Sequence, residues 1–431
     1  MEAIDALTNW QMLYERWLSV ARDHRNEIAL RELHSGRQWT FGQLREQSYA
    51  AACPAGGVSC PQGLSAEFIF TVLRAWRWGR VVSPLDSGQA SPEISSLPAQ
   101  IAHLKTTSAT SGSSRYVALT AGQLLADAEN IVRTMGLRID WPNLAVISLA
   151  HSYGFSNLVA PLLLHGIPLI LGSAPLPEVV LKAAALVPDV TLPAVPALWR
   201  AWHDSQAIPP NVRLAISAGA PLPLALEADI FQATGIKVHN FYGATECGGI
   251  AYDLSDRPRA DAACAGSALR GVELAATEDG ALAVRGAAVA ETYWPEVSSS
   301  LGGGRYLTND FAELRGGLVF LGGRTGDQIN VAGRKISPES IEQVLQTHPG
   351  VRECLVFGVP SPDAGRGEAV VACVVARSPV TPEELRQFIL SKLPAWQAPR
   401  DWWFVDSLGV SQRGKISRPA WRRKYQQRLA P

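Results

Sequence analysis

The spacing of hydrophobic residues predicts that the first part of the chain forms helices and short strands. Residues 10–22 place six apolar side chains on one helical face: Trp10, Leu13, Tyr14, Trp17, Leu18 and Ala21. Residues 28–33 and 37–40 are predicted to form a hairpin, and Thr40 is expected to cap the next helix through Gln43. A helix at 67–78 and a buried strand at 81–85 follow, and the Ser-, Pro- and Gln-rich residues 86–106 predict a loop.

In the middle of the chain, strands alternate with helical segments. Strands are expected at 144–149, 168–171, 189–192 and 214–217, with a helix at 159–165. Such alternation predicts a mostly parallel sheet with helices on both faces, and ligands bind such sheets at the carboxyl ends of the strands. Two glycine-containing segments, residues 217–221 and 242–246, follow strands in this way.

The pattern changes after residue 268. Residues 268–321 show short strands and turns, as in a small barrel-like sheet, and a glycine-rich junction follows at 322–326. Beyond it, helices at 338–346 and 381–392, the second capped by Thr381, and strands at 351–359 and 369–376 predict a compact α+β module. We therefore expect an α/β fold with a large N-terminal domain at 1–322, a junction at 323–327 and a small C-terminal domain at 328–431.

Composition excludes several classes of function. Hydrophobic residues make up 47% of the 431 residues, and 39 basic residues balance 39 acidic ones. This balance is typical of a globular protein and gives no basic excess for nucleic acid or an anionic membrane. The six cysteines show no CxxC pair or zinc spacing, which favours a reducing compartment. No apolar run reaches about 18 residues, so we expect a cytoplasmic protein without a membrane span.

Residues 107–115 form a candidate phosphate-binding loop. All of them except Arg115 are Ser, Thr, Ala or Gly, so backbone N–H groups and hydroxyls can approach an anion closely. The Lys-Ser/Thr ending of the P-loop is absent. Taken alone, such a segment is more often a flexible Ser-rich linker, because runs of Ser, Thr and Gly commonly form loops.

Four later motifs favour the phosphate-binding alternative. They are FYGATE at 241–246, YLTND at 306–310, GGRTGDQINVAGRKISP at 322–338 and RGKISR at 413–418. With these motifs the chain resembles the family of acyl- and aryl-CoA synthetases, peptide-synthetase adenylation domains and firefly luciferase. The resemblance covers nearly the whole chain. It implies an AMP-forming ligase that uses ATP and Mg²⁺ to adenylate a carboxylic acid and passes the acyl group to a pantetheine thiol.

The resemblance also implies which residues bind ATP. Those expected to cradle the β- and γ-phosphates are Thr107, Ser108, Thr110, Ser111, Gly112 and Arg115. Arg115 replaces the family's Lys, and a guanidinium fork differs from a point charge. The segment Gly219, Ala220 and Pro221 would line one face of adenine. Tyr242, followed by Gly243, would stack on the other face, Thr245 would bind the α-phosphate, and Glu246 would hold Mg²⁺.

Further residues follow from the same resemblance. Asp310 and Arg324 would grip the ribose or a phosphate, although such a pair is more often surface charge. Lys415 would be the catalytic lysine that contacts both the carboxylate and the α-phosphate, although a lone C-terminal lysine is normally solvated. Gly326 would be the hinge on which a mobile C-terminal domain turns between the two half-reactions, and residues 331–336 would enter the site for the second.

The acid is expected to bind beside residues 151–157. His151 would gate the carboxylate, while Phe155 and Asn157 would line an acyl pocket; a satisfied core histidine is the alternative. The acid would then be aromatic or a short-to-medium acyl chain, and the acceptor CoA or an acyl carrier protein. In the family that the chain resembles, a longer segment usually separates the strand that ends near Leu85 from the phosphate loop, whereas here only residues 86–106 do. The resemblance therefore implies that part of an N-terminal subdomain is missing. Short members of this kind resemble the ligases of aryl-polyene biosynthesis.

Two alternatives stay open on the sequence. The altered phosphate loop and the shortened N-terminal region also fit a degenerate synthetase that binds a nucleotide or acyl ligand without turnover. An adenylating enzyme that passes its acyl group to an amine or a hydroxyl would carry the same motifs.

Overall fold

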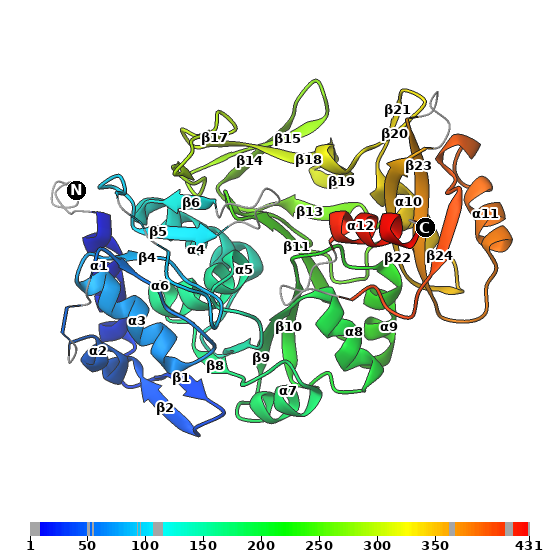
Figure 1. The fold of residues 1–431 in the computed structure, drawn as a ribbon. Coiled ribbons are helices and arrows are strands. Elements are labelled where there is room, and N and C mark those ends of the chain that lie inside the picture. The colour runs from blue at the N-terminus through cyan, green and yellow to red at the C-terminus, as the bar shows by residue number, and fades with distance from the viewer. Residues whose placement is uncertain are drawn as a thin grey trace.

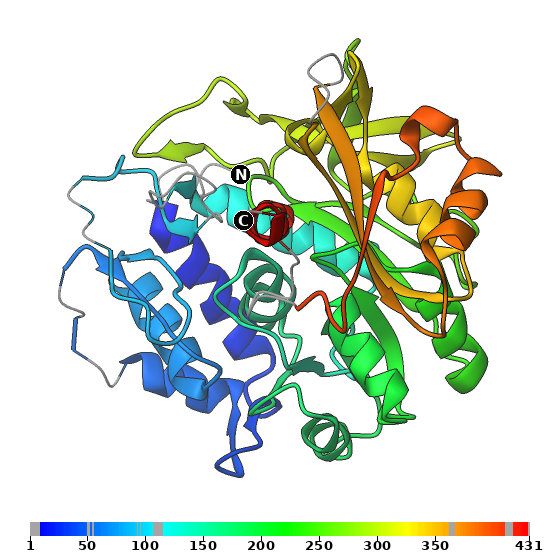
Figure 2. The ribbon, with the colours of Figure 1, turned by 45° about the vertical axis from the view of Figure 1, so that its right-hand side comes forward.

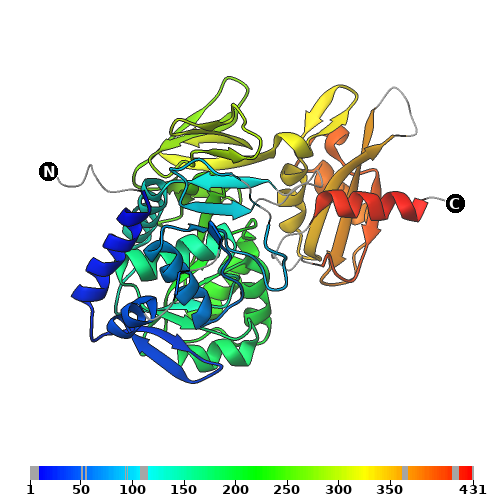
Figure 3. The same ribbon diagram turned by 60° about the vertical axis from the view of Figure 1, so that its left-hand side comes forward.

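The computed structural model describes residues 9–49, 52–53, 56–92, 94, 96–106, 115–361, 367–409 and 417–429. The chain forms a large α/β body, and the elements from β20 onward gather beside it (Figure 1). Figure 3 shows these later elements on the side of the molecule opposite the N-terminus. The predicted α/β class is therefore confirmed, while the exact domain bounds stay a prediction.

The body is built on one long mixed sheet. Its order is β14-β15-β18-β19-β13-β12-β11-β10-β9-β7-β8-β1-β2, with β17 attached to β18. The strands from β11 to β1 in this order are parallel. The bounds of this half are β1 Ile28–Glu32, β2 Arg37–Thr40, β7 Asn143–Ala145, β8 Leu169–Leu171, β9 Val190–Ala194, β10 Val212–Ser217 and β11 Val238–Ala244.

The sheet continues from β11 as antiparallel strands. They are β12 Gly248–Tyr252, β13 Cys264–Ala268, β14 Val272–Ala276, β15 Ala281–Gly286, β17 Leu301–Gly302, β18 Arg305–Arg315 and β19 Leu318–Arg324. The short strands expected after residue 268 therefore extend the parallel sheet through the β11–β12 hairpin.

Helices cover both faces of the parallel strands, as the alternating pattern predicted. Leu144 and Ala145 are consecutive in β7, yet they belong to different hydrophobic clusters. One cluster packs α1 Asn9–Asp23, α2 Phe41–Tyr49, α3 Ala66–Arg77, α4 Ala121–Met135 and α6 Ala160–His165; the other packs α7 Pro177–Ala184, α8 Pro196–Asp204 and α9 Leu224–Thr234. The cap at Thr40 is confirmed, because its hydroxyl accepts from Gln43 N while Gln43 Oε1 accepts from Thr40 N.

A second sheet has the order β16-β6-β5-β4-β3. Its bounds are β3 Val58–Ser59, β4 Val81–Val82, β5 His103–Thr106, β6 Tyr116–Leu119 and β16 Thr292–Trp294. The predicted loop at 86–106 is wrong at its end, since β5 occupies its last four residues. The predicted strands at 81–85 and 144–149 are shorter than expected, since β4 ends at Val82 and β7 ends at Ala145. Beyond β4, Leu85 forms only an isolated parallel bridge with Gln62.

The C-terminal elements form a small α+β unit. A hairpin of β20 Ile329–Val331 and β21 Arg334–Ile336 precedes α10 Pro338–Gln346. The strands β22 Val351–Pro360, β23 Glu368–Ala376 and β24 Asp401–Phe404 form one sheet, joined by α11 Pro382–Leu390 and followed by α12 Arg418–Leu429, which Figure 2 shows nearly end-on. The expected capping box at Thr381 is confirmed. Across the described residues, no helix combines the length and apolarity needed to cross a membrane.

Candidate active site

A hydrogen-bonded chain joins three residues that the sequence assigned to the nucleotide. The Tyr242 hydroxyl donates to Asp310 Oδ2 at 2.5 Å, and Arg324 Nε donates to Asp310 Oδ1 at 2.8 Å. The strand register sets the second contact, because Asp310 in β18 pairs directly with Arg324 in β19. Burial raises the pKa of the Tyr242 hydroxyl well above its usual value, and the Asp310 carboxylate raises it further. Tyr242 is therefore a neutral hydrogen-bond donor.

The β11–β12 hairpin presents Thr245 and Glu246 at its turn. Glu246 Oε1 accepts a hydrogen bond from the Tyr293 hydroxyl at 3.0 Å, and the Arg115 guanidinium lies 3.4 Å from the centre of the Tyr293 ring. Burial and the Glu246 carboxylate raise the pKa of Tyr293 to about 12, so it stays protonated. Tyr293 thus connects the end of the candidate phosphate loop to Glu246. Sequence reasoning missed Tyr293, which lies in none of the motifs.

Two glycines allow close backbone approach at this edge of the sheet. A Cβ on Gly243 would lie 2.6 Å from the carbonyl oxygen of Gly248 across the hairpin, so no side chain fits there. Gly219 has a φ of +86° in the turn that follows β10. Because β10 ends at Ser217, which pairs with Asn240 in β11, residues 218–221 and 242–246 leave the same edge of the sheet.

The segment that follows β7 returns toward the same strand ends. His151 Nε2 lies 3.3 Å from Asp86 Oδ1, and the Ser148 hydroxyl donates to the same oxygen at 2.9 Å. The Tyr153 hydroxyl lies 3.4 Å from the carbonyl oxygens of both Ala194 and Ile216, near the ends of β9 and β10. Asp86 was not identified from the sequence, since it lies in none of the motifs. Tyr153 lies within the predicted acid-binding segment 151–157, but it was assigned no role from the sequence.

Phe155 and Asn157 lie in a π-helical turn, η1 Phe155–Val159, between the short α5 Ser152–Gly154 and α6. Both side chains are buried: the Phe155 ring packs 4.3 Å from the His103 ring, and Asn157 Nδ2 donates to the Tyr153 carbonyl at 3.2 Å. π-helical turns are frequent at functional sites. The assignment of Phe155 and Asn157 to an acyl pocket stays a prediction.

Several predicted residues lie outside the described part of the chain. They are Thr107, Ser108, Thr110, Ser111, Gly112 and Lys415. The ends of the phosphate loop are nevertheless placed, because Thr106 of β5 pairs with Tyr116 of β6. The two strands that flank the loop, β5 and β6, are therefore antiparallel neighbours.

Arg418 anchors the chain three residues beyond Lys415. Its guanidinium donates to Asp327 Oδ2 at 2.8 Å and to both oxygens of Glu342 at 2.8 and 2.9 Å, and it lies 2.7 Å from Glu339 Oε1. Asp327 follows Gly326 in a 3₁₀ turn, η2 Thr325–Asp327. The region of the predicted hinge and the residues after RGKI are thus tied together, a role for Arg418 that sequence reasoning did not assign.

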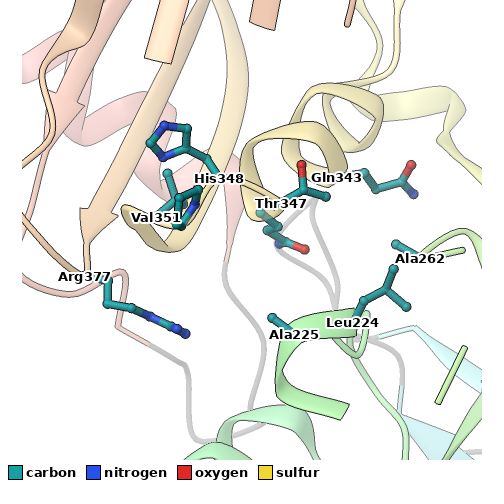
Figure 4. Close-up of a pocket in the computed structure, with 10 residues that line it drawn as sticks. Leu224, Ala225, Ala262, Gln343, Thr347, His348, Val351 and Arg377 are labelled. Carbon is teal, nitrogen blue, oxygen red and sulfur yellow. The ribbon is translucent and has the colours of Figure 1, made fainter. Parts of the chain in front are cut away.

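A small cleft of about 160 Å³ separates the body from the C-terminal unit (Figure 4). Leu224, Ala225 and Ala262 line one side, and Gln343, His348 and Arg377 are among those on the other. Beside it, α8 faces the start of β22, with Arg200 Nε 4.0 Å from Glu353 Oε1 and Arg352 Nη2 3.8 Å from Asp204 Oδ2. None of the predicted site residues lines this cleft.

The residues at the sheet edge suit a nucleotide chemically. Tyr242, Asp310 and Arg324 are grouped by hydrogen bonds, and Glu246 offers a further carboxylate at the turn of the β11–β12 hairpin. Across the described residues, no cluster of three His, Cys, Asp or Glu side chains could hold a metal ion. A single carboxylate nevertheless fits Mg²⁺, which proteins commonly bind through one or two carboxylates together with substrate phosphates.

Comparison with known proteins places the chain in a family. The sequence model described as AMP-binding enzyme matches residues 60–294, and that of the AMP-binding enzyme C-terminal domain matches residues 340–415. A probable 2-succinylbenzoate–CoA ligase of Mycobacterium tuberculosis is 30% identical over 75% of this chain and 85% of its own length. A feruloyl-CoA synthase of Amycolatopsis is 28% identical over 74% of this chain and 69% of its own length.

Solved structures agree with the fold. ATP-bound MatB from Rhodopseudomonas palustris aligns with a TM-score of 0.86 at 21% identity, over 98% of this chain and 100% of that one. The o-succinylbenzoate CoA synthetase MenE from Bacillus subtilis, in complex with its acyl-adenylate, aligns with a TM-score of 0.79 at 22% identity, over 96% and 98% of the two chains. The chain belongs to the AMP-binding enzyme family. It is an ATP-dependent, AMP-forming acid–thiol ligase.

Proposed function

We propose that this enzyme activates an aryl carboxylic acid, or a short-to-medium acyl acid, with Mg·ATP and transfers the acyl group to the thiol of CoA. The observation that carries the proposal is the Tyr242–Asp310–Arg324 chain, which groups three of the predicted nucleotide contacts at one edge of the sheet. Three relatives support an aryl acid, because they are named as ligases of 2-succinylbenzoate, ferulate and benzoates. Others are named as long-chain-fatty-acid–CoA ligases, which is why acyl acids stay in the proposal.

In the first half-reaction, a carboxylate oxygen of the acid attacks the α-phosphorus of ATP. The bond between the α-phosphorus and the bridging oxygen breaks, and pyrophosphate leaves with that electron pair. In the proposed pose, Tyr242 stacks on adenine against residues 219–221, and the Asp310 carboxylate accepts hydrogen bonds from the ribose hydroxyls. Thr245 donates to the α-phosphate, and Lys415 neutralises the negative charges that meet there.

Glu246 would hold Mg²⁺, which supplies positive charge against the phosphates of the leaving group. The Tyr293 hydroxyl occupies one side of the Glu246 carboxylate and so orients it. Arg115, whose guanidinium stacks on the same ring, would meet the β- and γ-phosphates at the end of the phosphate loop. On this proposal, the Arg115–Tyr293 stack would orient the guanidinium and so let an arginine take the place of the family's lysine.

In the second half-reaction, the thiol loses its proton and its sulfur attacks the acyl carbon of the adenylate. The mixed anhydride bond breaks, AMP leaves, and a thioester forms. We propose that the C-terminal unit turns about Gly326 between the two steps, so that residues 331–336 replace Lys415 near the site. His151, held by Asp86, would border the carboxylate's path.

Acid-dependent exchange of ³²P-pyrophosphate into ATP tests the first half-reaction. The panel consists of benzoate, 4-hydroxybenzoate, ferulate, 2-succinylbenzoate, butyrate and octanoate. We expect exchange with at least one aryl acid. The second candidate is a degenerate synthetase that binds ATP without turnover, which the altered phosphate loop favours. Binding of ATP without exchange for any acid would support it.

A screen of acceptors tests the second half-reaction. CoA, a phosphopantetheinylated carrier protein, an amine and an alcohol are each offered with the preferred acid, and the products are identified by mass spectrometry. We expect the CoA thioester. Formation of only an amide or an ester would contradict the thiol acceptor while leaving adenylation intact, and thioester on the carrier protein alone would replace CoA as the acceptor.

A further inference from the structure

A buried polar cluster lies beneath the site, in none of the sequence motifs. Lys105 in β5 and Asp127 in α4 have side chains only 1% and 2% exposed, and Lys105 Nζ lies 3.5 Å from Asp127 Oδ2. The Ser156 hydroxyl donates to the same oxygen at 2.6 Å and accepts from Lys105 Nζ at 3.1 Å. The backbone N–H of Gly249 donates to the other oxygen, Asp127 Oδ1, at 3.1 Å. We call these four groups the Lys105 cluster.

Each member of the Lys105 cluster belongs to a segment that leads into the candidate site. Lys105 lies two residues before the phosphate loop, on strand β5. Ser156 lies in the π-helical turn after His151, and Gly249 follows Glu246 by three residues on the β11–β12 hairpin. Asp127, in the helix that follows the phosphate loop, contacts all three of these segments.

The hairpin is packed directly onto the Asp127 carboxylate. A Cβ at Gly248, whose φ is +69°, would overlap Asp127 Oδ1. The carboxylate therefore touches the hairpin backbone at two consecutive residues, Gly248 and Gly249. Because the Asp127 carboxylate packs directly against this backbone, a shift of Asp127 would also move the turn that carries Thr245 and Glu246.

Stability alone does not account for the cluster. Taking two charges out of water is costly, and replacing a buried ion pair with apolar residues of similar volume is often neutral or stabilising. An ion pair with several directional hydrogen bonds instead fixes the geometry between the segments that it joins. Here it joins the base of the phosphate loop to the Glu246 hairpin and to the segment assigned to the acid.

We propose that Lys105 is a positioning residue for Mg·ATP, which acts through Asp127 to hold strand β5, the Glu246 hairpin and the π-helical turn in register. The inference rests on the proposed function for its substrate. Lys105 itself is buried away from solvent and reaches the nucleotide only through these segments. Two of the three joined segments, β5 and the Glu246 hairpin, lead to residues proposed to contact Mg·ATP, whereas only the turn with Ser156 leads to the acid. Loss of Lys105 should therefore weaken the use of Mg·ATP more than it weakens the use of the acid.

The test compares Lys105→Met with Lys237→Met as a matched control. Lys237 is also a buried lysine, paired with Glu227 and with Asp253 at 2.6 Å, and it lies in none of the proposed contacts with ATP. The measurements are the melting temperature, KM for Mg·ATP, KM for the acid and the maximal rate in pyrophosphate exchange. We expect both variants to melt at a lower temperature. Only Lys105→Met should raise KM for Mg·ATP, by about tenfold, with KM for the acid changed far less.

Equal kinetic effects in the two variants, or a lower melting temperature for Lys105→Met with an unchanged KM for Mg·ATP, would overturn the proposal and leave Lys105 a structural residue. If Lys105→Met does not fold, Ser156→Ala removes one hydrogen bond from the same carboxylate. It should raise KM for Mg·ATP by a smaller factor, and an unchanged KM would likewise overturn the proposal.

Failure of the positioning role of Lys105 can be distinguished from failure of the proposed function. If the wild-type enzyme supports no exchange with any acid, the proposed function fails, and the cluster is tested by calorimetric titration of the wild type, Lys105→Met and Lys237→Met with Mg·ATP. Weaker binding in Lys105→Met alone supports the positioning role. Equal binding in all three proteins overturns it.

Discussion

The Tyr242 hydroxyl and the Asp310 carboxylate are joined by a 2.5 Å hydrogen bond across 68 residues of sequence. Arg324 holds the second carboxylate oxygen, so both oxygens of Asp310 are oriented before any nucleotide binds. Because the carboxylate is oriented in advance, little side-chain entropy would be lost when ribose hydroxyls donate to it. The aromatic ring proposed for adenine and the acid proposed for ribose thus belong to one rigid unit.

Replacing Asp310 with Asn should raise KM for Mg·ATP by roughly tenfold or more, since hydrogen bonds to charged groups are worth about 1.5–3 kcal/mol. KM for the acid should change little. Steady-state pyrophosphate exchange at varied ATP measures the effect. Glu313→Gln is the control, because Glu313 is an exposed carboxylate on the same strand. If the two variants behave alike, Asp310 is merely a strand residue.

Glu246→Gln should weaken the use of Mg·ATP, since an amide oxygen is a poorer ligand than a carboxylate for a hard cation. Tyr293→Phe removes the hydroxyl that donates to Glu246 but keeps the ring beneath Arg115. We expect it to shift the Mg²⁺ dependence of the rate in the same direction, by a smaller factor. Magnesium titrations of the three proteins at fixed ATP make the comparison. Unchanged titrations would leave Glu246 a turn residue.

Lys415→Ala should lower the rate of adenylate formation by about 10²–10³, the typical cost of removing one electrostatic partner of a transition state. Thioester formation from chemically prepared acyl-adenylate should be affected much less. Lys424→Ala is the control, because Lys424 lies on α12 over the Trp421 ring and belongs to none of the proposed contacts. Equal losses in both half-reactions would argue against the proposed role of Lys415.

Gly326→Pro should preserve one half-reaction and abolish the other. Proline fixes φ near −65°, so a hinge at this position could reach only one of two backbone conformations. Gly326→Ala is the matched control: a Cβ there would meet no atom within 4 Å, and the φ of Gly326 is not in the left-handed region. We expect the alanine variant to retain both half-reactions. Full activity of the proline variant in both would place the pivot elsewhere.

Acid should destabilise the fold through its buried histidines. Burial lowers the pKa of His103, His165 and His239 below the ordinary value of about 6.5, so the folded protein holds these rings neutral. The unfolded chain binds more protons than the folded one between the lowered pKa and 6.5. Stability is therefore complete above about pH 7 and falls as the pH drops below 6.5, by up to about 1.4 kcal/mol per pH unit for each histidine.

Urea denaturation of the wild type and of His103→Gln between pH 5 and 8 measures this dependence. The variant should be less stable at pH 8, because its amide replaces a packed ring beside Phe155. Its stability should nevertheless fall less steeply in acid than that of the wild type. Parallel profiles would show that His103 does not titrate on unfolding.

The amino-acid sequence by itself determined the class of fold and the order of the segments. Local patterns were sufficient there: apolar periodicity predicted helices such as 338–346, and capping residues such as Thr40 and Thr381 set where helices begin. The five motifs identified the family because each needs particular side chains within a few consecutive residues. Helix caps, apolar periodicity and the motifs all depend on residues that are close together in the sequence, so they can be recognised without the structure.

Only the tertiary structure decided which distant residues meet. Strands β11 and β18 are four positions apart in the sheet order, roughly 19 Å if the sheet were flat, so the contact between Tyr242 and Asp310 depends on the sheet bending back. Tyr293 and Lys105 lie outside every motif, and their partners Glu246 and Asp127 come from other elements. Long-range contacts of this kind follow from strand order, sheet curvature and packing, which hydrophobic periodicity along the chain does not encode.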